Sequence, residues 1–153
     1  MGLDFTLYRK RKDMSISKFY KRPWEDIEKD ELAYGRKSWE LVNMLATNND
    51  VDEGYGILQK EAWDNLMKHM APIGDQLEDI IKAYEHFEYT IPGFVSAEDT
   101  SDFEYWYRTT FECEPRLGYS FAANYLKNFW DARNKIEAVL NDSENEVLMI
   151  ISY

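Results

Sequence analysis

The sequence has little of several residue types, and each shortage excludes a class of protein. Its single cysteine, Cys113, excludes a disulfide framework and is typical of a protein in a reducing compartment. The only histidines, His69 and His86, do not stand in a spacing that places two metal ligands on one helical face. No apolar run approaches the roughly 20 residues of a membrane span. We therefore expect a cytoplasmic protein without a metal, a cofactor or a membrane anchor.

Motifs that carry catalysis are also missing. The segment 54–56 (GYG) lacks the third glycine and the Lys-Ser/Thr of a P-loop, and no serine stands in a G-x-S-x-G turn. Cys113 lies between Glu112 and Glu114, whose charges should raise the pKa of the thiol and leave it unreactive. An enzyme would need a cleft where histidine and carboxylates converge, which no spacing indicates. We therefore expect a non-enzymatic protein.

Acidic residues, in contrast, are abundant and unevenly placed. Residues 1–40 hold ten Lys/Arg and eight Asp/Glu, whereas residues 41–153 hold eight and twenty-one, so the net charge of −11 divides into +2 and −13. At 153 residues, 44% of them hydrophobic, the chain has the size and apolar content of a single domain, 1–153. An acidic surface repels nucleic acid and membranes and attracts basic partners in a salt-dependent way.

Hydrophobic periodicity predicts an α+β fold of about four helices packed on a small, mainly antiparallel sheet that includes both chain termini. A kink is expected at Gly35, and Asp75 with Glu78 resembles a capping box. The predicted elements are strands at 3–8, 103–111 and 146–153, helices at 23–46, 59–70, 75–87 and 120–141, and loops at 47–56 and 90–101.

One segment, 75–114, combines eleven carboxylates and nine aromatic rings with only two basic residues, Lys82 and Arg108. A disordered acidic tail would lack the rings, so these acids belong to a folded surface. Carboxylates on a rigid surface can imitate the phosphates of DNA, and aromatic residues among them can anchor a protein interface. Acidity for solubility alone is the competing interpretation. The candidate partner-binding residues, on and around the predicted strand, are Glu98, Asp99, Asp102, Glu104, Tyr105, Trp106, Glu112 and Glu114.

A second charged segment, near the N-terminus, is basic and also carries rings. Such a patch could stack and bind single-stranded nucleic acid. The large negative charge elsewhere argues against this, and we expect a solvated basic edge that pairs with the protein's own acidic face. The residues concerned are Arg9, Lys10, Arg11, Lys12, Lys18, Phe19, Tyr20, Lys21, Arg22 and Trp24.

Several short motifs resemble those of a family of small phage and prophage proteins. The segments 1–8 (MGLDFTLY), 34–37 (YGRK) and 51–55 (VDEGY) are similar to the family's MGLDMYLY opening, its YWRK helix start and its acidic VDDCGEY loop. Gly35 replaces the family's tryptophan, and Trp39 and Val42 stand where relatives carry Asn and His. The family has no activity to transfer. The resemblance implies a phage accessory protein that acts in the bacterial cytoplasm.

Together these features favour a phage-encoded, acidic, non-enzymatic inhibitor of a nucleic-acid-targeting host defence system, of the anti-CRISPR or DNA-mimic type. Its partner would be a basic nucleic-acid-binding host protein, and we expect the inhibitor to be a monomer or small homo-oligomer that binds no nucleic acid itself. The alternative is a small-molecule or nucleotide-binding accessory protein, with an internal pocket lined by Arg36, Lys37 and Trp39.

Overall fold

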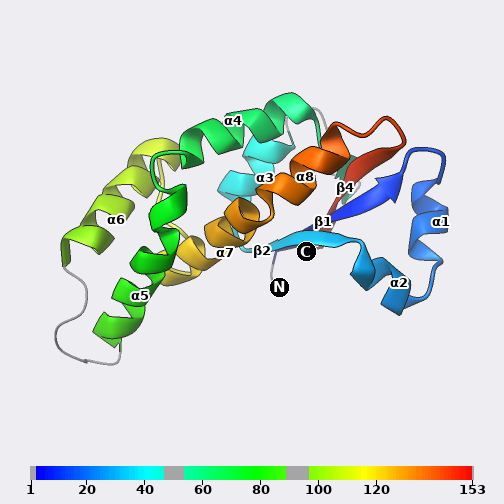
Figure 1. Cartoon of the computed structure of the whole chain (residues 1–153). Coiled ribbons are helices and arrows are strands. Elements are labelled where there is room, and N and C mark those ends of the chain that lie inside the picture. The colour runs from blue at the N-terminus through cyan, green and yellow to red at the C-terminus, as the bar shows by residue number, and fades with distance from the viewer. Residues whose placement is uncertain (1–2, 47–53, 89–96, 153) are drawn as a thin grey trace.

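The computed structural model describes residues 3–46, 54–88 and 97–152, and no side chain is described at 86–88 or 97–99. The described part contains eight α-helices and one four-stranded antiparallel sheet, so the predicted α+β class is confirmed with more helices than expected (Figure 1). The elements are β1 (Asp4–Arg11), α1 (Ile16–Tyr20), α2 (Trp24–Lys29), β2 (Glu31–Arg36), α3 (Trp39–Leu45), β3 (Tyr55–Ile57), α4 (Lys60–Met70), α5 (Leu77–Glu88), α6 (Ala97–Phe111), α7 (Tyr119–Asp131), α8 (Arg133–Leu140) and β4 (Asn145–Ser152).

The two strands nearest the chain ends form the centre of the sheet, whose order is β2-β1-β4-β3. β1 and β4 pair over their full lengths, from Asp4 opposite Ser152 to Arg11 opposite Asn145. The alternation of apolar residues in β1 places Leu3, Phe5 and Leu7 on one buried face, as period-2 patterning requires. Because β3 covers its other edge, β4 is a central strand, as its apolar sequence predicts.

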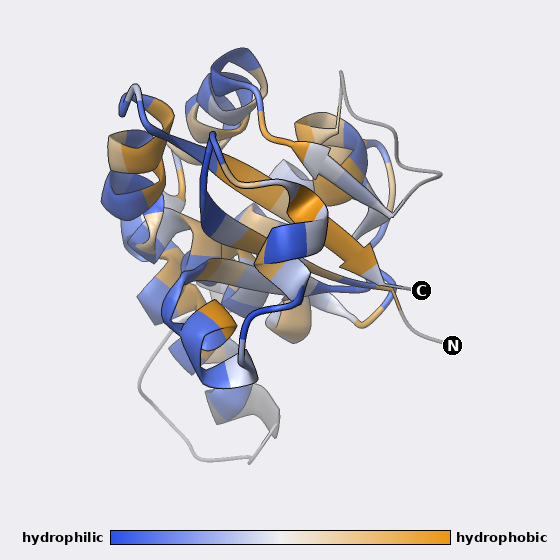
Figure 2. Cartoon of the chain, turned by 90° about the vertical axis from the view of Figure 1, so that its right-hand side faces the viewer, coloured by the Kyte–Doolittle hydropathy of each residue, from blue (hydrophilic) through white to orange (hydrophobic). Residues whose placement is uncertain are grey.

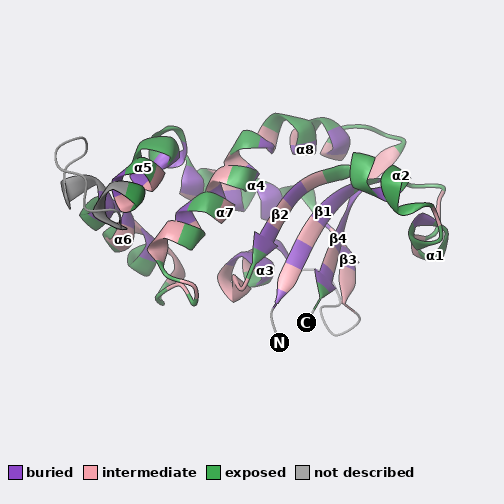
Figure 3. Ribbon diagram, turned by 90° about the horizontal axis from the view of Figure 1, so that it is seen from below, coloured by how far each residue is buried: buried purple, intermediate pink, exposed green. Residues whose placement is uncertain are grey.

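Helices cover the two faces of the sheet unequally. α3, α4, α7 and α8 pack on the face that carries Phe5 and Met149 and enclose the main core. On the other face Tyr8 and Leu148 pack with Phe19 of α1 in a smaller cluster at one end. α5 and α6 project at the opposite end of the molecule from α1 and α2, as two views show (Figures 1 and 3). Hydrophobic residues predominate in β4, whereas the helices carry both hydrophobic and hydrophilic residues (Figure 2).

The long helix predicted at 23–46 is wrong, because the chain forms α2, β2 and α3 there. Pro23 does precede a helix, but α2 ends at Lys29, and Trp24 is 64% exposed rather than buried. The segment 31–36 instead forms β2, whose backbone hydrogen-bonds to β1, a strand distant in sequence. The YGRK motif therefore spans the end of β2, and a helix begins only at Trp39.

The strand predicted at 103–111 is also wrong, since these residues lie in helix α6. Thr100, Phe103 and Tyr107 are buried at spacings of three and four, which is the helical period. Phe103 and Tyr107 join the main core. Aromatic residues favour strands only weakly, and packing against α5 overrides that preference here.

Two further predictions need smaller corrections. The helix predicted at 120–141 divides at Ala132 into α7 and α8, and Arg133 donates to the carbonyl of Trp130 across the break at 2.7 Å. Asp75 does not form the predicted capping box, because it lies inside a 3-10 turn, Gly74–Gln76, that leads into α5. Its carboxylate instead accepts a hydrogen bond from Nε1 of Trp130 at 3.1 Å. The helices predicted at 59–70 and 75–87 are confirmed as α4 and α5. Of the two predicted loops, residues 47–53 and 90–96 lie outside the described residues. The described parts correct both predictions, because residues 55–56 lie in β3 and residues 97–101 begin α6.

Gly35 marks a close approach within β2 rather than a helix kink. A Cβ atom at this position would lie 2.5 Å from Cζ of Phe5. The Phe5 ring cannot move away freely because it is fully buried and stacks on Phe129, with ring centroids 5.5 Å apart. Glycine is therefore required here by packing rather than by backbone conformation.

We predict that Gly35→Ala destabilises the protein by about 1–3 kcal/mol, because overpacking forces neighbouring rings or backbone to shift. The midpoint of urea unfolding would measure this loss. A Phe5→Leu substitution in the same chain should remove the clash, so the two changes together should cost less than the sum of their separate effects. Strictly additive effects, or an unchanged midpoint for Gly35→Ala, would contradict the packing argument.

Candidate protein-binding surface

The acidic segment forms an arm that consists of α5, α6 and the short stretches before α5 and after α6, residues 75–76 and 112–114. Tyr84 of α5 joins the helices: its ring meets that of Phe103 edge-on, with centroids 6.3 Å apart, and its hydroxyl donates to Glu104 at 3.3 Å. Burial and the neighbouring Glu104 carboxylate raise the pKa of the Tyr84 hydroxyl, so it remains a protonated donor. Further rings continue this packing, since Phe103 also stacks on Trp106 at 5.9 Å. An aromatic interior thus holds the acidic surface in place.

The helical geometry of α6 determines which predicted interface residues face solvent. Asp102, Tyr105 and Thr109 are exposed at spacings of three and four, so they form one outward stripe. Tyr105 is 67% exposed, more than any other large hydrophobic residue in the described part of the chain. Glu112 follows the stripe with φ of 59°, in the left-handed region where a helix commonly ends. Asp102, Tyr105, Glu112 and Glu114 therefore remain accessible candidates.

Two predicted interface residues turn inward instead. Trp106 is half-buried, and its Nε1 donates to the carbonyl of His69 in α4 at 3.2 Å. Glu104 is also half-buried and accepts the Tyr84 hydroxyl. An alternating strand would have placed Glu104 and Trp106 together on one exposed face and Tyr105 on the opposite face, whereas the helix exposes Tyr105 and turns the other two inward. Glu98 and Asp99 lie in the first turn of α6, but their side chains are outside the described residues.

Most carboxylates of the arm have no cationic partner. Eight of them have described side chains, and among described residues only Glu78 forms an ion pair, with Lys82 at 3.5 Å. The other basic residue, Arg108, donates to the hydroxyl of Tyr119 at 3.2 Å. The exposed acids without an ion pair are Asp75, Asp79, Glu85, Asp102, Glu112 and Glu114. No nearby cation neutralises these carboxylates, so they repel one another and give this surface a strong negative electrostatic potential.

The basic segment is different, because much of its charge is neutralised locally. Asp30 pairs with both Arg9 at 3.0 Å and Arg22 at 2.9 Å. Lys10, only 4% exposed, pairs with Glu146 at 2.6 Å. Arg11 pairs with Asp13 at 3.1 Å. These cations do form ion pairs with carboxylates, as predicted. The carboxylates, however, lie at the same end of the molecule, on Asp13, Asp30 and Glu146, and not on the α5–α6 arm.

The rings of the basic segment are unequal as stacking surfaces. Phe19 is fully buried and lies under the guanidinium of Arg22, which is 4.4 Å from the ring centroid. Tyr20 and Trp24 are exposed to 46% and 64%. Burial raises the pKa of the Tyr20 hydroxyl to about 12. Lys12, Lys18 and Lys21 are exposed without an ion pair among the described residues.

The internal pocket predicted for a nucleotide is nearly closed. Arg36 and Lys37 line a hollow beside Arg116 and the start of α7, but its volume is about 10 Å³, which is the space of roughly one water. Trp39 does not line it, and Arg36 pairs with Asp4 at 3.2 Å. This hollow therefore offers no room for a nucleotide.

Other chemistry has little structural support in the described part of the chain. Those residues contain no group of three or more His, Cys, Asp or Glu side chains placed to bind a metal. None of the helices that could be examined has the length and apolar character needed to cross a membrane. No protein-family model, curated protein or solved structure matches the chain. The charge and exposure of its surfaces are therefore the remaining indications of function.

Cys113 follows the arm and is held protonated by an acid that the sequence did not indicate. Its thiol donates to Oε1 of Glu40 in α3 at 3.0 Å, although 73 residues separate the two. Partial burial, followed by this hydrogen bond and the Glu40 charge, raises the pKa of the thiol to about 11. The pKa is raised, as predicted, but by burial and by Glu40 rather than by Glu112 or Glu114.

We predict that Cys113 is alkylated slowly at pH 8, because the thiolate is the reactive form and the raised pKa keeps it scarce. Glu40→Gln removes the negative charge, should lower the thiol pKa and should accelerate alkylation by iodoacetamide roughly tenfold, the change expected per pKa unit. Glu112→Gln serves as a matched control and should leave the rate almost unchanged. Equal rates in wild type and Glu40→Gln would contradict this account.

Proposed function

We propose that the protein is a non-enzymatic inhibitor that binds a basic, nucleic-acid-binding host protein through the α5–α6 arm. The observation that carries this proposal is that the arm combines several carboxylates that have no ion pair with the exposed Tyr105 of α6. Lys and Arg side chains that line a DNA-binding site would gain the same electrostatic attraction from these acids as from phosphates. Tyr105 would supply the aromatic contact that typically carries much of the energy of a protein interface.

The construction of the arm favours recognition over solubility as the reason for its charge. Rigid presentation reduces the ordering cost of binding, and the Tyr84–Phe103–Trp106 packing fixes both helices relative to the core. A surface that only needed solubility would intersperse charges of both signs, as the basic segment does through Asp13 and Asp30. We propose a DNA-mimic mode, with a defence nuclease of the bacterial host as the partner class.

The first test is capture of bacterial lysate proteins on the immobilised chain at low salt. We predict that the retained proteins are nucleic-acid-binding, that duplex DNA displaces them and that high salt releases them, because the attraction is electrostatic. Neutralising the arm with Asp102→Asn, Glu112→Gln and Glu114→Gln should abolish retention. Tyr105→Ala alone should weaken it by roughly tenfold or more, as expected for a central aromatic anchor.

A matched control neutralises three exposed acids at the other end of the molecule. Glu25→Gln, Asp26→Asn and Glu28→Gln change the net charge by the same amount but lie on α2. This variant should retain the partner. If both triple variants lose binding equally, net charge rather than the arm is responsible, and if purified host nucleases are neither bound nor inhibited at low salt, the proposed inhibition is wrong.

A further inference from the structure

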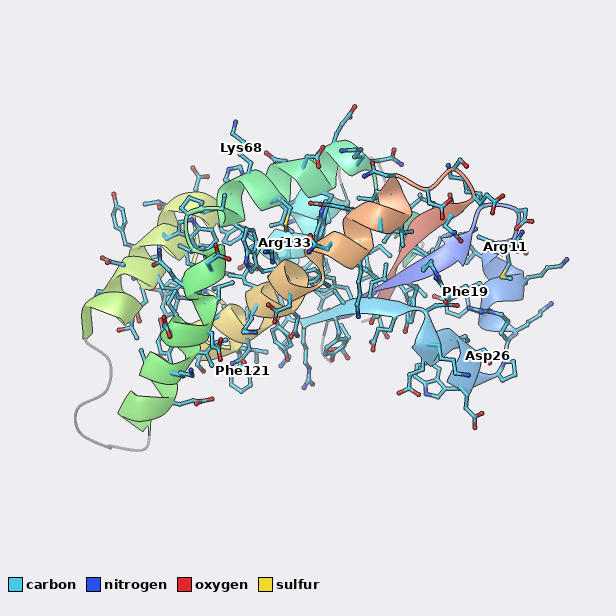
Figure 4. The ribbon with its side chains drawn as sticks, viewed as in Figure 1. Arg11, Phe19, Asp26, Lys68, Phe121 and Arg133 are labelled. Atoms are coloured by element: carbon cyan, nitrogen blue, oxygen red, sulfur yellow. The ribbon has the colours of Figure 1, made fainter. Side chains whose placement is uncertain are left out.

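A second candidate site lies at the end of the molecule opposite the arm. A cavity of about 300 Å³ opens between the end of β1, α1 and the segment leading into β2, which reaches the lower limit of small-ligand pockets. Figure 4 labels Arg11 at the end of β1 and Phe19 between β1 and α1. The cavity is lined by Arg9, Lys10, Arg11, Met14, Phe19, Arg22, Asp30, Glu144 and Asn145.

The floor of this cavity is a buried, fully bonded lysine. Nζ of Lys10 donates to the carbonyls of Arg11 at 2.8 Å and Met14 at 2.5 Å and pairs with Glu146 at 2.6 Å. These three contacts join β1, the turn before α1 and β4. Lys10 therefore has no donor left for a ligand, and its role is to hold the arginines in position.

The three arginines, in contrast, have more donors than acceptors. Arg9 and Arg22 share the single carboxylate of Asp30, so this trio carries one uncompensated positive charge. Nη2 of Arg22 lies 2.9 Å from Oδ2 of Asp30, within ion-pair distance but without the geometry of a hydrogen bond. Asp30 thus engages one nitrogen of each guanidinium and leaves their remaining nitrogens without a carboxylate among the described residues. Arg11 is held by both oxygens of Asp13 at 3.1 Å.

We infer that this cavity binds the phosphoryl group of a small phosphorylated ligand. A phosphate presents several acceptor oxygens in a geometry that guanidinium groups match, and it would accept from the nitrogens of Arg9 and Arg22 that Asp30 does not engage. Glu144 is the opposing feature, since its carboxylate lines the same cavity. With Asp13 and Glu146 counted, the charges around the site balance, so local hydrogen bonds rather than long-range attraction determine binding.

The test uses the full-length protein at constant ionic strength. Inorganic phosphate, a nucleoside monophosphate and a single-stranded oligonucleotide are titrated by calorimetry, with thermal stability as a second readout. We expect phosphate and the monophosphate to bind and to raise the melting temperature, since a ligand that binds only the folded state stabilises it. Binding of the oligonucleotide alone would instead indicate the exposed lysines of α1 and would overturn the inference, as would binding of none.

Variants locate the site. Arg9→Gln and Arg22→Gln should each raise the dissociation constant for phosphate roughly tenfold, as expected for a lost charge-assisted hydrogen bond. Lys18→Gln removes the same charge from an exposed position outside the cavity and should change the constant less than about twofold, whereas Glu144→Gln should tighten binding.

Arg22 also packs over Phe19, whereas the side chain of Arg9 is 56% exposed. Arg9→Gln therefore tests the site without disturbing the core. Equal effects of Arg9→Gln and Lys18→Gln would contradict the proposed location. This result is independent of whether the α5–α6 arm binds a host protein.

Discussion

The pairing of β1 with β4 is the interaction on which the remaining structure depends. It joins the two chain ends, and each strand then supplies its other edge to one further strand, β2 or β3. The side chains of the pair also separate the two cores: Phe5 and Met149 face the large helical layer, while Tyr8 and Leu148 face α1 and α2. Both cores therefore form only when residues about 140 positions apart have met, and such non-local contacts require a large loss of chain entropy.

Elements that carry their own hydrophobic pattern were predictable from the sequence. β1 and β4 show alternation or a continuous apolar run, and α4 and α5 bury one stripe each, so local periodicity identifies them. β2 has no comparable signal, because Tyr34 and Gly35 are selected by contacts with β1 rather than by a local period. The backbone hydrogen bonds of β2 are made with β1, which is distant in sequence. The helical spacing of apolar residues on either side of β2 therefore suggested one continuous helix.

The error at α6 has a different physical origin and matters more for the candidate site. Phe103, Tyr105, Tyr107 and Phe111 satisfy alternation, yet Phe103, Tyr107 and Phe111 also satisfy a spacing of four. When rings are this dense, both periods fit, and only packing against Tyr84 and the core decides between them. In the helix Tyr105 is exposed, and Trp106 contacts α4 instead of facing solvent. Sequence thus located the acidic segment correctly but could not determine which side chains share its outer face.

The two ends of the molecule differ in how far their charges are paired, and this difference says more about function than the net charge does. At the α1 end, Lys10, Arg9 and Arg11 each have a carboxylate within ion-pair distance, although the protein as a whole has an excess of acids. In the arm, eight described carboxylates share one such pair. Repulsion among unpaired charges opposes folding, and here the aromatic packing beneath α6 offsets it. Acids that served only solubility could be spread over the whole surface without this repulsion. Their concentration in one segment that also exposes a tyrosine is instead what a basic partner surface would select.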